Sequence, residues 1–263
     1  MRGDILKKKL MVLCAVAIMI STCLTGCKMN SGKIRFGSAG IGGTYQIFGD
    51  TFANLISSKS KKYNIEVKTT AGSAANLRLL SKDYIQMAVA QMDLINDAYN
   101  RTGIFENDKK YQGYRAVASL YTEACQIVVP ADSDIQSMDD LEGKKVCIGE
   151  EESGTEQNAL QILNAYGLNE RLVDTVNLNY TDAAKKLKSG DIDAFFCTAG
   201  VQTTVINELS KQCKIRVVSL DQKGISRLKK SYKFYTEYTI PAGTYVNQTK
   251  EVKTVGVKAV LLA

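Results

Sequence analysis

The stretch KIRFGSAGIGGTYQIFGDTFANLISS, residues 33–58, decides the fold class, because it joins a strand to a helix through a glycine-rich turn. Residues 33–38 alternate polar and apolar side chains, which is typical of a half-buried strand. Residues 39–43 form the turn, and residues 44–58 carry apolar side chains at helical spacing. This spacing predicts one buried helix face, made of Ile47, Phe48, Phe52, Leu55 and Ile56.

The same alternation continues along the rest of the chain. Strands are predicted at residues 33–38, 63–69, 84–90, 114–120, 125–129, 145–149, 172–178, 193–197 and 215–220. Helices are predicted at residues 44–58, from Ser73 through Leu80, from 91–93 to near 101, and at 155–166, 182–189 and 202–211. Such regular alternation indicates an α/β fold, a mostly parallel sheet with helices on both faces. The pattern occurs twice, which predicts two similar halves.

The N-terminal segment has the features of an export signal. Basic residues precede an apolar run of 11 residues, Leu10 to Ile20. A membrane-spanning helix needs about 20 apolar residues, whereas a signal needs about 7–15. The tetrapeptide Leu24-Thr25-Gly26-Cys27 resembles a bacterial lipobox, which implies cleavage before Cys27 and a lipid on its thiol. Residues 1–26 are thus predicted to be a lipoprotein signal peptide and residues 27–32 a short tether, the alternative being an ordinary secretory signal.

The amino-acid composition excludes several classes of function. Apolar residues make up 45% and charged residues 23% of the chain, which are ordinary globular values. The net charge of +7 falls to +4 without residues 1–26, and the basic residues are scattered, so nucleic-acid binding is not favoured. Histidine is absent, which excludes Ser-His-Asp and Cys-His catalysis and every zinc site that uses imidazole. We expect no catalytic residue, no metal and no cofactor.

Four cysteines besides Cys27 remain after processing, namely Cys125, Cys147, Cys197 and Cys213. Export permits disulfides, but spacing alone does not fix a pairing. Cys147 and Cys197 lie in apolar strand-like runs, so buried free thiols are at least as well supported as a bridge.

Three of the turns are suited to bind an anion. Ligands of open α/β sheets bind beyond the carboxyl ends of the strands, and helix N-termini attract negative charge. The turns at Gly43-Thr44-Tyr45, at Ser73 and at Ser153-Gly154-Thr155 each precede or begin a helix. For Ser73 a simple N-cap is the alternative. The glycine-rich turn is not a phosphate-binding P-loop, because it lacks the terminal Gly-Lys-Ser/Thr.

An ordered set of segments resembles the TAXI family, the solute-binding subunits of one class of TRAP transporters. The resemblance covers about residues 33–263, and no single segment carries it. The segments are FGSAGIGGTY (36–45), TAGSAANLRLL (70–80), VAQMD (89–93), LYTE (120–123), DLEGK (140–144), SGTE (153–156), GDIDAFF (190–196) and IPAGTY (240–245).

The resemblance implies a two-lobe periplasmic-binding-protein fold of type II. Lobe 1 would comprise residues 33–125 plus 238–263, and lobe 2 residues 126–237. It further implies a small anionic ligand, either an acidic amino acid such as glutamate or a dicarboxylate, and a TRAP membrane subunit as partner. The ligand-binding residues that it implies are Gly43, Thr44, Tyr45, Ser73, Asn76, Gln91, Ser153, Gly154 and Thr155. Asp93 is expected to cap a helix, because it would repel an anion.

The C-terminus departs from the family pattern, which continues past the segment matching residues 255–263. The sequence is therefore expected to be a fragment or a truncated product. Its last apolar strand would then have nothing to cover it.

Other functions share these features. The same fold and lipid anchor would suit the binding protein of an ABC importer or an extracytoplasmic sensor domain. An enzyme would need a Cys or Ser nucleophile with Lys or Glu as its base. Arg78 is a candidate to neutralise a ligand carboxylate, with a solvated helix face as the alternative. Glu123 and Glu156 are candidates for an ammonium group or a cation, with a structural role as the alternative.

Overall fold

The computed structural model describes residues 32–109 and 111–263. The predicted signal segment and Cys27 lie outside the described residues, so cleavage and lipidation stay predictions. The strands are β1 (Gly32–Gly37), β2 (Tyr63–Lys68), β3 (Met87–Gln91), β4 (Ala116–Pro130), β5 (Lys145–Gly149), β6 (Asp174–Asn177), β7 (Ala194–Ala199), β8 (Ile215–Val217), β9 (Thr236–Ile240) and β10 (Val252–Leu262). The α-helices are α2 (Thr44–Lys59), α3 (Ser73–Ser81), α4 (Met92–Asn100), α5 (Gly154–Ala165), α6 (Tyr180–Ser189), α7 (Thr204–Gln212) and α8 (Gln222–Ser231). Two 3₁₀ turns lie at Gly103–Phe105 and Asp139–Leu141.

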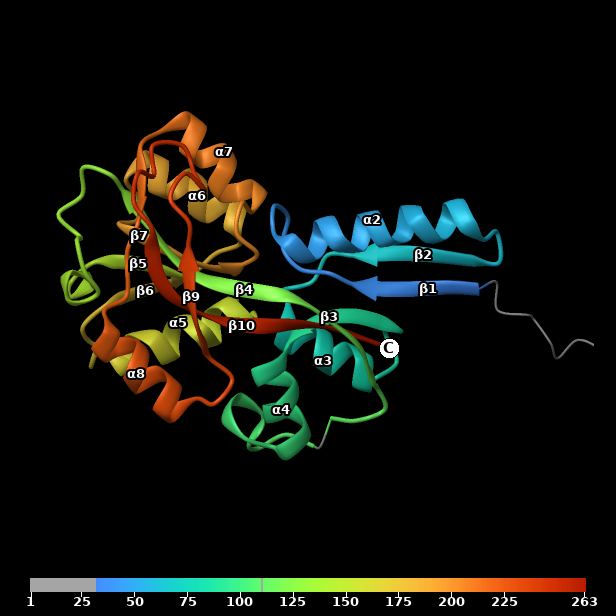
Figure 1. Cartoon of the computed structure of the whole chain (residues 1–263). Coiled ribbons are helices and arrows are strands. Elements are labelled where there is room, and N and C mark those ends of the chain that lie inside the picture. The colour runs from blue at the N-terminus through green and yellow to red at the C-terminus, as the bar shows by residue number, and fades with distance from the viewer. Residues whose placement is uncertain (1–31, 110) are drawn as a thin grey trace, which may run out of the picture.

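One sheet in the order β2-β1-β3-β10-β4-β7-β5-β6 runs through the described chain. Strands β2, β1 and β3 are parallel, and so are β7, β5 and β6. The long strands β10 and β4 lie between these two groups and pair antiparallel with their neighbours. They cross the middle of Figure 1 and connect the half that contains β1–β3 to the half that contains β5–β7.

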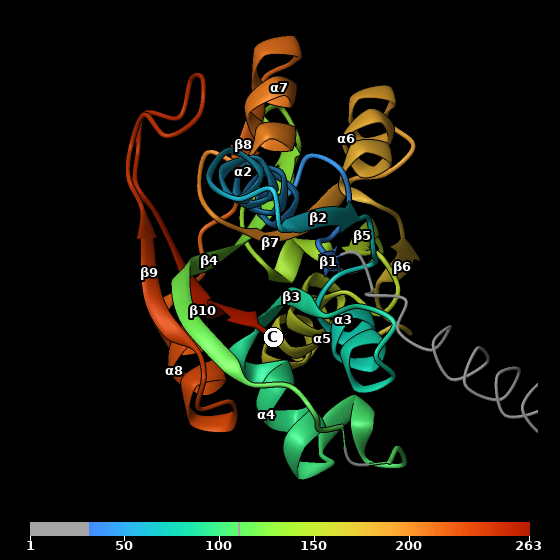
Figure 2. The same cartoon turned by 90° about the vertical axis from the view of Figure 1, so that its right-hand side faces the viewer.

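Helices cover both faces of each half. In the first half, α2 packs over one face, whereas α3 and α4 bury Ala74, Leu77 and Leu94 against the other (Figure 2). In the second half, α5 and α8 cover one face and α6 and α7 the other. The predicted fold class, two lobes each with a mostly parallel sheet flanked by helices, is confirmed. Among the described residues, no helix combines the length and apolar character needed to cross a membrane.

Strand β4 differs from the prediction of two separate strands at residues 114–120 and 125–129. It is one continuous strand of 15 residues that ends at Pro130, as expected. Residues 121–124 read as a break because Thr122 and Glu123 are polar. They continue the strand because β10 pairs with them on one side, with Glu123 opposite Val257.

The C-terminal strand was expected to be uncovered, and this prediction is wrong. Strand β10 is interior, paired with β3 and β9 on one side and with β4 on the other. Val255, Ala259 and Leu262 are fully buried. Helix α4 packs against this strand, so the apolar residues near position 263 have a covering layer.

The predicted buried face of α2 is also partly wrong. Ile47 and Leu55 are 47% and 53% exposed, whereas Phe48 and Phe52 pack on Phe36. Successive helical residues are separated by about 100°, so position 47 turns away from the inner face that positions 45, 48, 52 and 56 share. Position 55 lies at the edge of that face, next to position 48, and Leu55 is exposed there.

The four cysteines of the described chain are free thiols. Cys125, Cys147 and Cys197 are buried, and Cys213 is partly buried. Of the two alternatives that the sequence left open, the structure shows the thiols.

Candidate ligand-binding site

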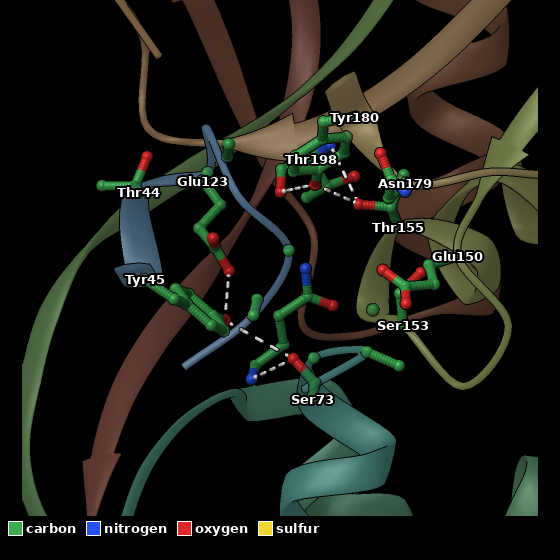
Figure 3. A pocket seen from close by; sticks show the side chains of 18 residues that line it. Thr44, Tyr45, Ser73, Glu123, Glu150, Ser153, Thr155, Asn179, Tyr180 and Thr198 are labelled. Carbon is green, nitrogen blue, oxygen red and sulfur yellow. Dashed lines mark hydrogen bonds between the residues drawn. The ribbon is translucent and has the colours of Figure 1, made fainter. Parts of the chain in front are cut away.

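A cavity lies between the two halves of the sheet (Figure 3). Its walls come from the loops that follow β1, β2, β5 and β6, from the ends of β3 and β7, and from the middle of β4. It is lined by Ala39, Gly40, Gly43, Thr44, Tyr45, Ala71, Gly72, Ser73, Gln91, Glu123, Glu150, Ser153, Gly154, Thr155, Asn179, Tyr180, Thr198 and Ala199. Eight of the nine predicted ligand-binding residues are in this set, and Asn76 is not.

Asn76 is fully buried beneath the site. Its amide donates to the carbonyl oxygens of Ser38 (2.7 Å) and Val89 (2.9 Å), and its Oδ1 accepts from Thr70 Oγ1. The side chain therefore ties α3 to the ends of β1 and β3. Asn76 therefore holds α3 in place through the core and does not line the cavity.

The wall of the first half is a chain of buried hydrogen bonds around Tyr45. Its hydroxyl donates to Glu123 Oε2 at 2.7 Å and lies 3.5 Å from Ser73 Oγ. Ser73 Oγ accepts from the backbone N–H of Gln91 at 3.1 Å. Ser73 was a candidate N-cap, but Gly72 holds that position and Ser73 is the first residue of α3. Its hydroxyl is thereby free to join α3 to the end of β3.

The wall of the second half is built around Thr155. Its hydroxyl lies 2.6 Å from Tyr180 Oη and accepts from the backbone N–H of Thr198 at 3.3 Å. Tyr180 Oη donates to the Thr198 carbonyl at 3.0 Å. Ser153 is the N-cap of α5, and its Oγ accepts from Glu156 N at 3.0 Å. These bonds fix the ends of β7, α5 and α6 at one edge of the cavity.

Four lining residues were not among the predicted ligand-binding residues, namely Glu150, Asn179, Tyr180 and Thr198, and the role of Glu123 was left open. Asn179 and Tyr180 follow β6 and begin α6, so the rule on strand ends would have found them. The same rule applies to Glu150 and Thr198, at the ends of β5 and β7. Glu123 gives no such signal, because it lies in the middle of β4.

The electrostatics of the cavity combine helix N-termini with carboxylates. Residues at or next to the N-termini of α2, α3, α5 and α6 line it, where N–H groups lack intrahelical partners and the dipole is positive. Among the 18 described lining residues, two are glutamates and none is Lys or Arg. Arg78, the candidate counter-ion, instead pairs with Asp108 at 2.7 Å and is not part of the lining. The cavity therefore offers hydrogen-bond donors for a carboxylate and two acidic side chains for a cationic group.

Burial raises the pKa of the carboxyl groups that line the cavity. Desolvation raises the pKa of Glu123 to about 8, while hydrogen bonds from Tyr45 and Gln91 oppose the rise. Burial likewise raises the pKa of Glu150.

Asp93 does not line the cavity. Its carboxylate accepts from Asn158 Nδ2 at 3.1 Å, and burial raises its pKa to about 6. The predicted helix cap at Asp93 is not formed as expected, since Gln91 is the N-cap of α4.

The raised pKa values of Glu123 and Asp93 predict that the free energy of unfolding falls as the pH rises. Between the ordinary pKa of 4.5 and about 8, folded Glu123 keeps a proton that the unfolded chain has lost, so stability decreases through this window. One pKa unit is worth about 1.4 kcal/mol, and we expect a loss of at least that size between pH 5 and pH 8. Asp93 adds to the lower part of the window. The chain has no histidine to titrate in this range.

Urea unfolding at pH 5, 6.5 and 8 measures this effect. Glu123→Gln should flatten the profile, since Tyr45 can still donate to the amide oxygen. Glu142→Gln, at an exposed position, is the matched control and should keep the wild-type slope. A wild-type stability that is constant or rises over this range would contradict the prediction.

Comparison with known proteins supports the same architecture. Residues 36–263 match the sequence model of the NMT1-like family. The chain belongs to the NMT1-like family. The structure of this NMT1-like protein is similar to the periplasmic aliphatic sulphonate binding protein SsuA from Escherichia coli, with 18% identity, a TM-score of 0.51, and coverage of 88% of this chain and 64% of that chain.

Two further solved structures show the same likeness. The alkanesulfonate-binding protein SsuA from Xanthomonas axonopodis pv. citri, bound to MOPS, has 15% identity and a TM-score of 0.53 over 88% of this chain and 65% of that chain. Holo ArgBP from T. maritima has 14% identity and a TM-score of 0.52 over 88% and 82%. This NMT1-like protein thus spans slightly less than two thirds of the two SsuA chains. At these identities the likeness establishes the fold, that of the two-lobe periplasmic binding proteins.

Proposed function

We propose that this protein is an extracytoplasmic solute-binding lipoprotein of a TRAP-type transporter, which captures a small carboxylate by closing its two lobes. One observation carries the proposal: the turns implied by the TAXI resemblance, far apart in the sequence, supply eight of their predicted residues to one cavity between the halves. The ordered segments that resemble the TAXI family support the TRAP assignment. The proposed anchor is a lipid on Cys27, which holds the protein at the membrane.

The closing motion follows from the connections between the halves. The predicted lobes, residues 33–125 plus 238–263 and residues 126–237, remain a proposal, with β4 and β10 as the two crossings. Ile240, Tyr245 and Val252 pack with α6 and α7, which favours a second crossing inside β10. A solute that contacts both walls stabilises the closed state through contacts that an open state lacks.

Within the predicted ligand class, the cavity favours an acidic amino acid over a plain dicarboxylate. The N-termini of α2, α5 and α6 and the hydroxyl groups of the lining can hold the carboxylates. Glu123, which keeps its proton near pH 7, can release it and accept a hydrogen bond from an ammonium group, and Glu150 is a second acceptor. A plain dicarboxylate has no ammonium group to donate to them. L-Glutamate and 2-oxoglutarate are a matched pair, because they differ only in an ammonium group and a keto oxygen.

Calorimetric titration of the purified protein tests the proposal. We expect L-glutamate to bind with micromolar affinity and 2-oxoglutarate at least about tenfold more weakly. An ammonium group would favour ionised Glu123, so binding near pH 7 should release a proton, and the heat should depend on the buffer. Flat heats for glutamate, glutamine, 2-oxoglutarate and C4 dicarboxylates would overturn the carboxylate proposal.

The alternative functions need a separate observation. A fused membrane subunit with many spans, encoded beside this chain, supports the TRAP transporter. A neighbouring ATPase gene would favour the ABC importer instead. Turnover of a bound solute would support an enzyme, for which the family and the similar structures offer no positive indication.

A further inference from the structure

The loop between β5 and α5 contains a residue in an unfavourable backbone conformation. Glu152 has φ of 63°, the left-handed region, which residues other than glycine seldom adopt. Such a conformation persists only where the surroundings hold it in place. Its backbone N–H donates to Glu156 Oε2 at 2.9 Å, and its carbonyl points to the other half of the sheet.

The Glu152 carbonyl oxygen accepts hydrogen bonds from the first turn of α3. Glu152 O accepts from the backbone N–H groups of Ala74 (3.2 Å) and Ala75 (3.3 Å). The first N–H groups of a helix have no partner within their own helix, so an oxygen from outside must satisfy them. The second half of the protein supplies this oxygen. The N-terminus of α3 is thereby closed to a solute carboxylate at these two amides.

The side chain of Glu152 makes a second contact with α3. Its Oε1 lies 3.0 Å from Arg78 Nε, and the two side chains form an ion pair without a hydrogen bond. Arg78 is held from the other side by Asp108, and its guanidinium lies over the Phe105 ring at 5.1 Å. Arg78 is thus fixed within the first half, and the contact with Glu152 joins it to the second.

We propose that Glu152, through the amides of Ala74 and Ala75 and the side chain of Arg78, acts as a latch that holds the two halves closed without solute. The Glu152 latch lies beside the cavity, since its neighbours Ser73 and Ser153 line it while Glu152 and Arg78 do not. These two are therefore positioning residues for the solute site.

The latch has a consequence for binding, which rests on the proposed function. The apparent dissociation constant of a closed-state ligand is divided by the fraction of molecules already closed. A weaker latch lowers that fraction and opens the halves more often. We therefore expect weaker solute binding and faster release, although no atom that faces the solute has changed.

Amide hydrogen exchange, followed residue by residue by NMR in the solute-free protein, tests the latch directly. Glu152→Val should increase exchange at Ala74 and Ala75 by at least about tenfold, because a β-branched residue disfavours the left-handed conformation. Glu152→Gly favours that conformation and should retain most of the protection. Glu151→Val, at the exposed neighbouring position, is the control and should match the wild type.

A second measurement separates a latch from a merely structural loop. Stopped-flow binding of L-glutamate to Glu152→Val should show a dissociation rate raised by about threefold to tenfold. Unprotected amides at Ala74 and Ala75 in the solute-free wild type would overturn the latch. Equal exchange in Glu152→Gly and Glu152→Val would also overturn it. Protected amides in a wild type that binds no carboxylate would leave the latch standing and refute the proposed function.

Discussion

Replacing Gly154 with alanine is expected to weaken L-glutamate binding by between about tenfold and 100-fold while the protein remains folded. A Cβ at Gly154 would overlap Oε1 and Cδ of the Gln91 side chain. Gln91 is almost completely buried, so its amide can move only into the cavity, unless the two halves separate. The clashing atoms are the end of a flexible side chain, so they can move without disturbing the core, but either response disturbs the closed site. We therefore expect the loss, about 1–3 kcal/mol, to fall on solute binding and not on folding.

The helix itself should tolerate the change. Gly154 is the first residue of α5, and alanine has a higher helix propensity than glycine. We therefore expect a free energy of unfolding close to that of the wild type in the solute-free protein. Loss of binding together with loss of folding would contradict the proposed mechanism, because the clash is then with the core and not with closure.

A double-mutant cycle with Gln91→Ala provides the control. Gln91→Ala removes the atoms that the new Cβ would meet, so adding Gly154→Ala in that background should change the affinity by less than about threefold. Calorimetric titration with L-glutamate of the four proteins measures the coupling. Equal effects of Gly154→Ala in both backgrounds would refute a clash with Gln91.

The turns of the site could be predicted from the sequence because their chemistry is local. A strand followed by glycine, serine or threonine and then by helical spacing identifies each of the turns at Gly43, Ser73 and Ser153 without knowledge of pairing. The type and the order of most helices and strands could be predicted from the spacing of apolar residues. Their assembly into one cavity depended on the resemblance, since nothing local indicates that residues 43 and 153 face one another.

The features that were missed depend on tertiary partners. Glu123 looks like a polar interruption between two strands, and only the pairing of β4 with β10 makes it a buried carboxylate inside one strand. The role of Arg78 could not be read from its position on α3, because Asp108 and Glu152 reach it from distant segments. Helix α8 and strand β9 were not predicted at all.

Phe196→Ala is expected to destabilise the protein by about 3–5 kcal/mol. Phe196 lies on β7 with 1% of its surface exposed, in the core cluster that α5 and α8 cover. Removing its ring leaves a cavity that the surrounding strands cannot fill. Because natural domains have only about 5–15 kcal/mol of stability in total, this loss is a large share.

Leu55→Ala is the matched comparison, because sequence periodicity and structure disagree about this residue. A buried leucine would lose about 2–5 kcal/mol on truncation. Leu55 is instead exposed on α2, where alanine is a better helix former, so we expect a change within about 0.5 kcal/mol. Urea unfolding of both variants at one pH gives the two values. A loss at Leu55 as large as that at Phe196 would show that the outer face of α2 is covered in solution, and the arrangement of α2 described above would then be wrong.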